Sequence, residues 1–158
     1  MRTILIALIA LFLSLPTLAE EQAEHFTLAQ FRQAAQSVMA NPLGPNAKAN
    51  CRTVIGWTVE SPKVSVTIGP PILNIRNTGQ TQAEMSLFCA YMAGQALTQL
   101  EHKVKGGYPE AGGEAVIAAY AKIQKAQPTY KNEAVEFLIQ AKSQGRLADL
   151  LAPKGLQK

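Results

Sequence analysis

The stretch that decides the fold is TQAEMSLFCAYMAGQALTQLEHKVKGG, residues 81–107. Thr81 and Glu84 have the spacing of a capping box, in which each side chain bonds to the backbone of the other residue at a helix start. After this start, the first half of the predicted helix is apolar on nearly all sides and rich in small residues. Two lysines and the Gly106-Gly107 pair then suit a helix end, where cations face the negative end of the helix dipole. The stretch therefore predicts a long, buried central helix.

Before this helix, the apolar residues change from a helical period to alternation. Ile55, Trp57 and Val59 alternate with smaller or polar residues, and after a short break Val64, Val66 and Ile68 do the same. Strict alternation is typical of half-buried strands. We predict two antiparallel strands joined by a tight turn, with 72–76 as a third strand.

The segments on either side have the helical period. Apolar residues at Phe26, Phe31 and Val38 predict an amphipathic helix from about Thr27 to Ala40. After the central helix, Gly112-Gly113 delays the next helix to about Glu114, and Pro128 ends it. A helix over 131–143 and a last turn over 147–151 follow, so the chain should close with an antiparallel helical hairpin.

The predicted fold class is α+β and mostly helical. A small antiparallel sheet of two or three strands packs on the long central helix, with the helical hairpin at the C-terminal end. No repeat or linker divides residues 20–158, so we expect a single domain there.

The first 19 residues have the pattern of a secretory signal peptide. Arg2 precedes an apolar run from Ile4 to Leu15, and Thr17 and Ala19 supply the small residues that signal peptidase requires before Glu20. The run is shorter than the roughly 20 residues that cross a membrane. We expect cleavage after Ala19, a periplasmic or secreted product, and no later transmembrane segment.

Export would place the two cysteines in an oxidising compartment, where disulfides persist. We predict an intramolecular Cys51–Cys89 disulfide that joins the start of the first strand to the central helix. A redox or metal-binding thiol pair lacks the usual short spacing and neighbouring His, and an intermolecular bridge is the third alternative.

Residue types that support catalysis are scarce. The chain holds two His and a single Asp, Asp149, so a nucleophilic triad or a metal site would have to use scattered positions. No catalytic residue, metal site or cofactor is predicted. Glutamates could still serve as acid and base on a glycan, and Glu110, Glu114 and Glu101 are the candidates.

Two aromatic residues are candidate binding residues. Tyr108 lies in a loop between two glycine pairs, where an exposed aromatic could contact a ligand. Trp57 is either a core residue or a platform for a sugar. Without Arg2 the formal net charge falls from +4 to +3, and the lysines alternate with glutamates, so nucleic acid is not an expected partner.

The segment Phe88-Cys89-Ala90-Tyr91-Met92-Ala93-Gly94, followed by two predicted helices, resembles in part the small exported helical immunity proteins that neutralise type VI effectors. Those proteins carry a Cys, then Gly-Tyr, then Gly on a helix. Here Tyr91 and Gly94 are displaced by one position and the predicted strands have no counterpart, so the sequence assigns no family.

Three functions remain open. The scarcity of catalytic residue types favours a non-catalytic protein that binds another exported or envelope protein, as an inhibitor, immunity factor or assembly accessory. The alternatives are a glycan-acting envelope enzyme and a carrier of a small apolar ligand. The carrier predicts an enclosed cavity beside Trp57, Phe88 and Met92.

Overall fold

The structure, a computed structural model, describes residues 25–76 and 81–152, and these residues form helices without a single strand. The α+β prediction is therefore wrong, and the described fold is all-α. Its elements, in chain order, are α1 (Leu28–Ala40), α2 (Ala47–Glu60), α3 (Pro70–Leu73), the 3₁₀ turn η1 (Asn74–Arg76), α4 (Gln82–His102), α5 (Pro109–Ala126), α6 (Glu133–Ser143) and α7 (Leu147–Leu151).

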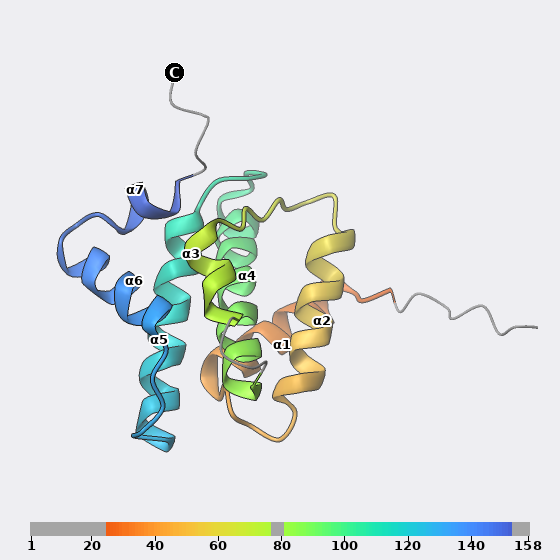
Figure 1. Ribbon diagram of the computed structural model, residues 1–158. Helices are drawn as coiled ribbons and strands as arrows, with labels where there is room; N and C mark the ends of the chain where they lie inside the picture. The colour runs from red at the N-terminus through yellow and green to blue at the C-terminus, as the bar shows by residue number, and fades with distance from the viewer. Residues whose placement is uncertain (1–24, 77–80, 153–158) are drawn as a thin grey trace, which may run out of the picture.

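Helix α4 is the central element, as predicted. Figure 1 shows it between the α1–α2 pair on one side and α5, α6 and α7 on the other. The capping box is present: the Thr81 hydroxyl accepts from the Glu84 N–H, and the Glu84 carboxylate accepts from the Thr81 N–H. The helix ends at His102, with Lys103 in the left-handed region at φ 56°, ahead of the glycine pair.

The first predicted strand is the second half of helix α2. Its buried residues Cys51, Val54 and Trp57 are three apart, which is the helical period, whereas Val59 is 73% exposed. The alternation of Ile55, Trp57 and Val59 therefore did not mark one buried face. Packing against α1 and α4 selects the helix.

The second predicted strand is extended but has no partner strand. From Val64 to Gly69 the chain crosses from α2 to α3 with neither helix nor turn (Figure 1). Its backbone groups bond to side chains of α4: the Ser65 N–H donates to Gln99 Oε1 at 2.8 Å, and Gln99 Nε2 donates to the Ser65 carbonyl at 3.0 Å. Gln95 binds both backbone groups of Thr67 in the same way, at 3.3 and 3.1 Å.

This arrangement explains why the alternation misled. Two glutamines one helical turn apart lie about 6 Å apart along the axis, close to the spacing of every second residue in an extended chain. Gln95 and Gln99 are almost completely buried. Their amides supply the hydrogen bonds that a neighbouring strand would otherwise supply.

The third predicted strand is also helical. Gly69 precedes Pro70 and Pro71, which begin α3, and the chain continues into η1. Proline is well suited to the first position of a helix, because that N–H has no helical partner anyway. Ile72 and Ile75, three apart, are both fully buried.

Helices α4 and α5 approach closely through glycines. A Cβ atom on Gly94 would lie 2.6 Å from the Ala111 carbonyl oxygen, and one on Gly112 would lie 2.8 Å from the Tyr91 carbonyl oxygen. The expected delay of α5 to Glu114 is thus wrong, since α5 begins at Pro109 and runs through both glycines. Glycine lowers the intrinsic stability of a helix, but here it lets the backbones of α4 and α5 pack closely, which offsets this loss.

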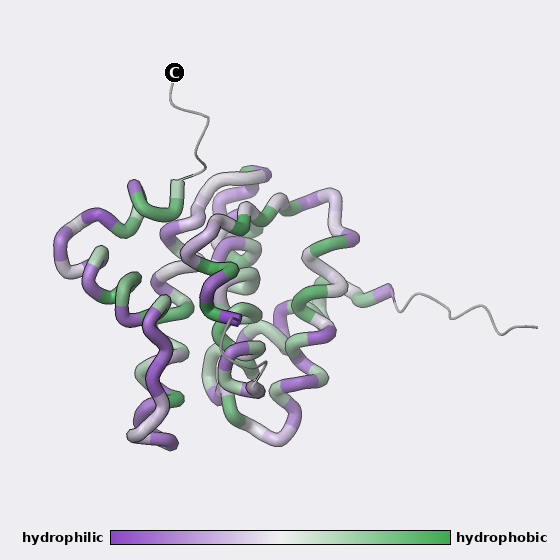
Figure 2. Tube along the Cα trace, viewed as in Figure 1, coloured by the Kyte–Doolittle hydropathy of each residue, from purple (hydrophilic) through white to green (hydrophobic). Residues whose placement is uncertain are grey.

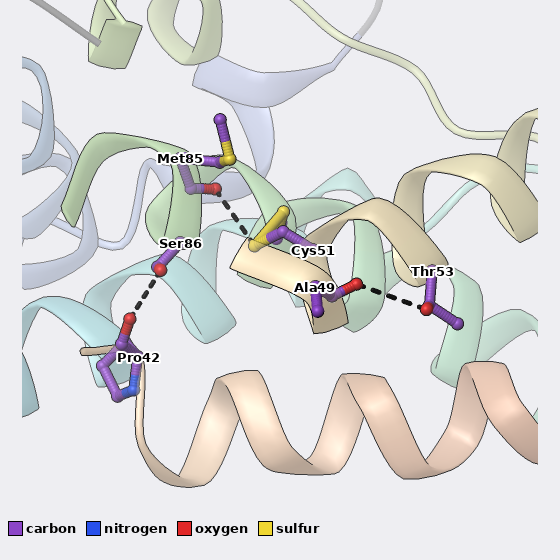
Figure 3. The surroundings of a disulfide bond; sticks show 7 residues. Pro42, Ala49, Cys51, Thr53, Met85 and Ser86 are labelled. Carbon is purple, nitrogen blue, oxygen red and sulfur yellow. Dashed lines mark hydrogen bonds between the residues drawn. A yellow bond between two sulfur atoms is a disulfide. The ribbon is translucent and has the colours of Figure 1, made fainter. Parts of the chain in front are cut away.

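The disulfide Cys51–Cys89 is present and joins α2 to α4, with 5.5 Å between the two Cα atoms. Both cysteines are fully buried beside Val38 of α1. In Figure 3, Cys51 Sγ lies 3.7 Å from the Met85 carbonyl oxygen, and the neighbouring Ser86 hydroxyl donates to the Pro42 carbonyl at 2.6 Å. The disulfide therefore fixes the side of α4 that faces α1 and α2.

The predicted helix over 131–143 and the last turn over 147–151 are confirmed as α6 and α7. The core contains residues from α1 through α7, among them Phe31, Leu87, Tyr120, Leu138 and Leu151. No helix in the described ranges is long and apolar enough to span a membrane. The predicted signal peptide lies outside these ranges.

Candidate functional site

A groove of about 1050 Å³ runs between the segment Thr67–Asn74 on one side and α6 with α7 on the other. One side consists of the extended segment and the two prolines that follow it, and the other consists mainly of apolar side chains of α6 and α7. The principal side chains are Ile68, Pro71, Asn132, Ala134, Phe137 and Leu150.

Phe137 is the most prominent of these residues. It is 48% exposed, although the neighbouring α6 residues Val135 and Leu138 are completely buried. The phase of the helix explains the difference, since 135, 138 and 141 form the stripe that faces the core and 137 lies off it. Phe137 also lines a second hollow of about 430 Å³, together with Glu136 and Gln140 among others.

Asn132 positions α6 against the opposite wall. Its Oδ1 caps the helix by accepting from the Val135 N–H at 3.2 Å, and its Nδ2 donates to the Ile75 carbonyl at 3.0 Å. Its own backbone N–H donates to the Tyr120 hydroxyl at 3.2 Å. One almost fully buried side chain therefore connects α6 with η1, and its backbone adds α5.

The Tyr120 hydroxyl continues this network by donating to Glu136 Oε1 at 2.7 Å. Burial, followed by the carboxylate of Glu136, raises the pKa of Tyr120 to about 12. The phenol thus stays protonated, and stays a donor, across the physiological range. The N-terminal end of α6 is therefore held by the hydrogen bonds of Asn132 and by the bond from the Tyr120 hydroxyl to Glu136.

The other two walls are apolar. Ile68 is 37% exposed at the end of the extended segment, and Pro70 and Pro71 stiffen the chain that follows. Leu150 and Leu151 of α7 also line the groove, and Figure 2 shows α7 as largely hydrophobic after the hydrophilic α6–α7 connection. Lys131 and Glu133 supply one charge of each sign to the lining.

The predicted binding residue Trp57 lies in the core. It is 6% exposed, and its ring stacks on that of Phe31 with 4.1 Å between centroids. Phe88 and Met92 are likewise buried in this core. Trp57 therefore offers little surface to a sugar.

Tyr108, in contrast, lies at the surface together with two of the candidate glutamates. It precedes α5 with φ 66°, its ring stacks on His102 at 5.3 Å, and with Glu110 and Glu114 it lines a hollow of about 450 Å³. The Glu114 carboxylate pairs with Lys142 of α6. Glu101, near the end of α4, is exposed and does not line this hollow.

Phe137 was not among the predicted binding residues, which were Tyr108 and Trp57. Its position between Val135 and Leu138 was the available signal. The Asn132 cap was not predicted, because the expected helix over 131–143 already included this residue, and its contacts with Tyr120 and Ile75 reach 12 and 57 residues along the chain.

Comparison with protein-family models, curated proteins and solved structures finds no match. Within residues 25–76 and 81–152, no three His, Cys, Asp or Glu side chains are grouped to hold a metal ion. The groove of about 1050 Å³ that Phe137 lines is therefore the candidate functional site.

Proposed function

We propose that the chain is an exported, non-catalytic protein that binds another exported or envelope protein, as an inhibitor, immunity factor or assembly accessory. The supporting observation is the half-exposed Phe137 beside an apolar groove. Exposed aromatic residues next to pockets are typical anchors of protein interfaces. The buried disulfide is consistent with an oxidising compartment such as the periplasm.

The rigid construction of the groove favours the same function. Asn132 and the two prolines restrain the opposing walls, so binding there would cost little ordering of the chain. One Lys and one Glu in the lining do not favour a highly charged ligand. A partner that inserts an apolar side chain or helix face beside Phe137 fits this composition best.

The test is purification of the protein from the envelope of an exporting cell, with Phe137→Asp as the disruptive variant. Val104→Asp is the matched control, because Val104 is similarly exposed but does not line the groove. We expect a partner that is retained by the wild type and the control, is lost with Phe137→Asp, and rebinds in purified form. A monomer without a captured partner would contradict the proposal.

The hollow around Tyr108, Glu110 and Glu114 favours a second candidate function, an envelope enzyme that acts on glycan. Glu110→Gln and Glu114→Gln variants, assayed on isolated peptidoglycan, test it. Loss of turnover in either variant supports the enzyme, whereas a wild-type protein without turnover removes it. The third alternative, a carrier of a small apolar ligand, requires an enclosed cavity beside Trp57, Phe88 and Met92, and these side chains are packed in the core.

A further inference from the structure

The extended segment Val64–Ile68 has one occupied and one unoccupied edge. Gln95 and Gln99 bind the N–H and carbonyl groups of Ser65 and Thr67, which therefore point toward α4. In an extended chain the groups of the intervening residues point the opposite way. The N–H and carbonyl groups of Val66 and Ile68 thus face away from α4.

This outer edge is unpaired in the described part of the chain. No hydrogen bond is formed there by the backbone of Val66 or Ile68. Figure 1 shows the segment running along the rim of the molecule between α2 and α3. An unpaired row of backbone donors and acceptors is a template for another extended chain.

The surface beside the extended segment has a suitable composition, with residues of α2, the segment and α4. A hollow of about 360 Å³ lies next to the segment, lined by Val59, Val66, Ile68, Met92 and Lys105 among others. Val59 is highly exposed although it is apolar. Such a hollow can receive the alternate side chains of a paired strand.

Charge at this site is mainly positive. Lys105 lines the hollow, and the exposed Lys63 directly precedes the extended segment. The nearest carboxylate in sequence, Glu60, faces His25, with 3.2 Å between Oε2 and Nδ1. A partner segment with a carboxylate beside its apolar residues is complementary to these two lysines.

We propose that the outer edge of Val64–Ile68 is a second binding site, which takes an extended peptide segment of another protein by strand addition. The bound segment alternates apolar residues and carries an acidic residue near one end. Its backbone pairs with Val66 and Ile68, and its apolar side chains enter the hollow beside Val59. This site adjoins the Phe137 groove and shares Ile68 with it, but Val59, Val66 and Lys105 line only the hollow beside the extended segment.

The test begins with a random octapeptide library displayed on phage and selected on the immobilised wild-type protein. Synthetic versions of the enriched peptides are then titrated by fluorescence anisotropy against the wild type and Val66→Pro. Proline removes the outward N–H while keeping an extended conformation. Loss of one backbone hydrogen bond predicts a Kd raised about fivefold to tenfold.

Matched variants separate the two surfaces and the role of charge. Phe137→Asp should leave peptide affinity unchanged, whereas Lys105→Glu should lower it and the exposed Lys48→Glu should not. If Val66→Pro does not fold, N-methylation of alternate peptide residues removes the same hydrogen bonds from the other side. Amide exchange at Val66 and Ile68 should slow when the peptide is added.

Four results would overturn the proposal. The first is a selection that enriches no peptide. The second is a peptide that binds the Val66→Pro variant as tightly as the wild type, or that keeps its affinity after N-methylation, and the third is a peptide that no longer binds the Phe137→Asp variant. The fourth is exchange at Val66 and Ile68 that slows only with rising protein concentration. The last result would assign the edge to a second copy of this chain. None of them would affect the partner test at Phe137.

Discussion

The side-chain amide of Gln99 makes two hydrogen bonds to the backbone of Ser65, which lies 34 residues earlier in the chain. Its Oε1 accepts from the Ser65 N–H, and its Nε2 donates to the Ser65 carbonyl. The same Oε1 also accepts from the Gly106 N–H at 2.7 Å. One glutamine of α4 thus satisfies the segment before the helix and the loop after it. The extended segment keeps its course because α4 carries this side chain.

Replacing Gln99 with alanine should destabilise the protein strongly. The backbone groups of Ser65 and Gly106 would lose their partners at a partly buried site, at a cost of about 1–3 kcal/mol. Chemical unfolding in urea measures this difference. Gln33→Ala on the exposed face of α1 is the matched control and should change stability by less than about 0.5 kcal/mol. Equal stability of the two variants would contradict the structural role of Gln99.

Removing the disulfide should also lower stability. Cys51 and Cys89 are separated by 38 residues, and closing a loop of this length restricts the unfolded chain by about 4 kcal/mol in the chain-entropy treatment. The double variant Cys51→Ala/Cys89→Ala should unfold at lower urea than the oxidised wild type. A reductant should shift the wild type toward the variant and leave the variant itself unaffected. Insensitivity of both proteins to reductant would argue against the bond.

Gly94→Ala should disturb the packing of α4 on α5. The new Cβ would meet the Ala111 carbonyl oxygen, which cannot move without moving the helix, and the expected loss is about 1–3 kcal/mol. At Gly69, the nearest atom to an added Cβ is 3.6 Å away, so Gly69→Ala serves as the control with a smaller effect. A Gly94→Ala variant more stable than the wild type would show that the helices are not in close contact.

Stability should fall at alkaline pH. Burial raises the pKa of Tyr91 to about 12, and its hydroxyl donates to the Thr67 carbonyl at 2.9 Å. The unfolded phenol has a pKa of about 10, so the folded state holds the proton more tightly. This contribution is complete below about pH 10 and is lost as the pH rises toward 12. Urea unfolding across this range measures the loss, and Tyr91→Phe should reduce it while Tyr120 still contributes.

Helix α4 could be predicted because its signals are local. The capping box involves residues three apart, and the mixture of apolar and small residues is continuous along the helix. The disulfide was equally accessible, because two cysteines permit one intramolecular pair. Helices α6 and α7 have clear polar or glycine-containing boundaries, and the sequence places them correctly.

The errors lie where partners are distant in sequence. Alternation over 64–68 correctly indicates an extended chain, but a helix side chain at Gln95 or Gln99 takes the place of the expected strand. The Gly112-Gly113 pair reads as a helix delay until Tyr91 and Leu151 are found packed against it. Trp57 is ambiguous in sequence and becomes a core residue only through Phe31.

The sequence by itself determined the central helix, the Cys51–Cys89 pairing and the shortage of catalytic residue types, since each depends on neighbouring residues or on counting. The tertiary structure alone decided that the chain has no sheet in its described part, that Phe137 borders a groove, and that Val66 presents a free edge. Those features depend on which backbone and apolar groups find partners across the core. Such partners are chosen by packing and by hydrogen-bond satisfaction, which no local pattern records.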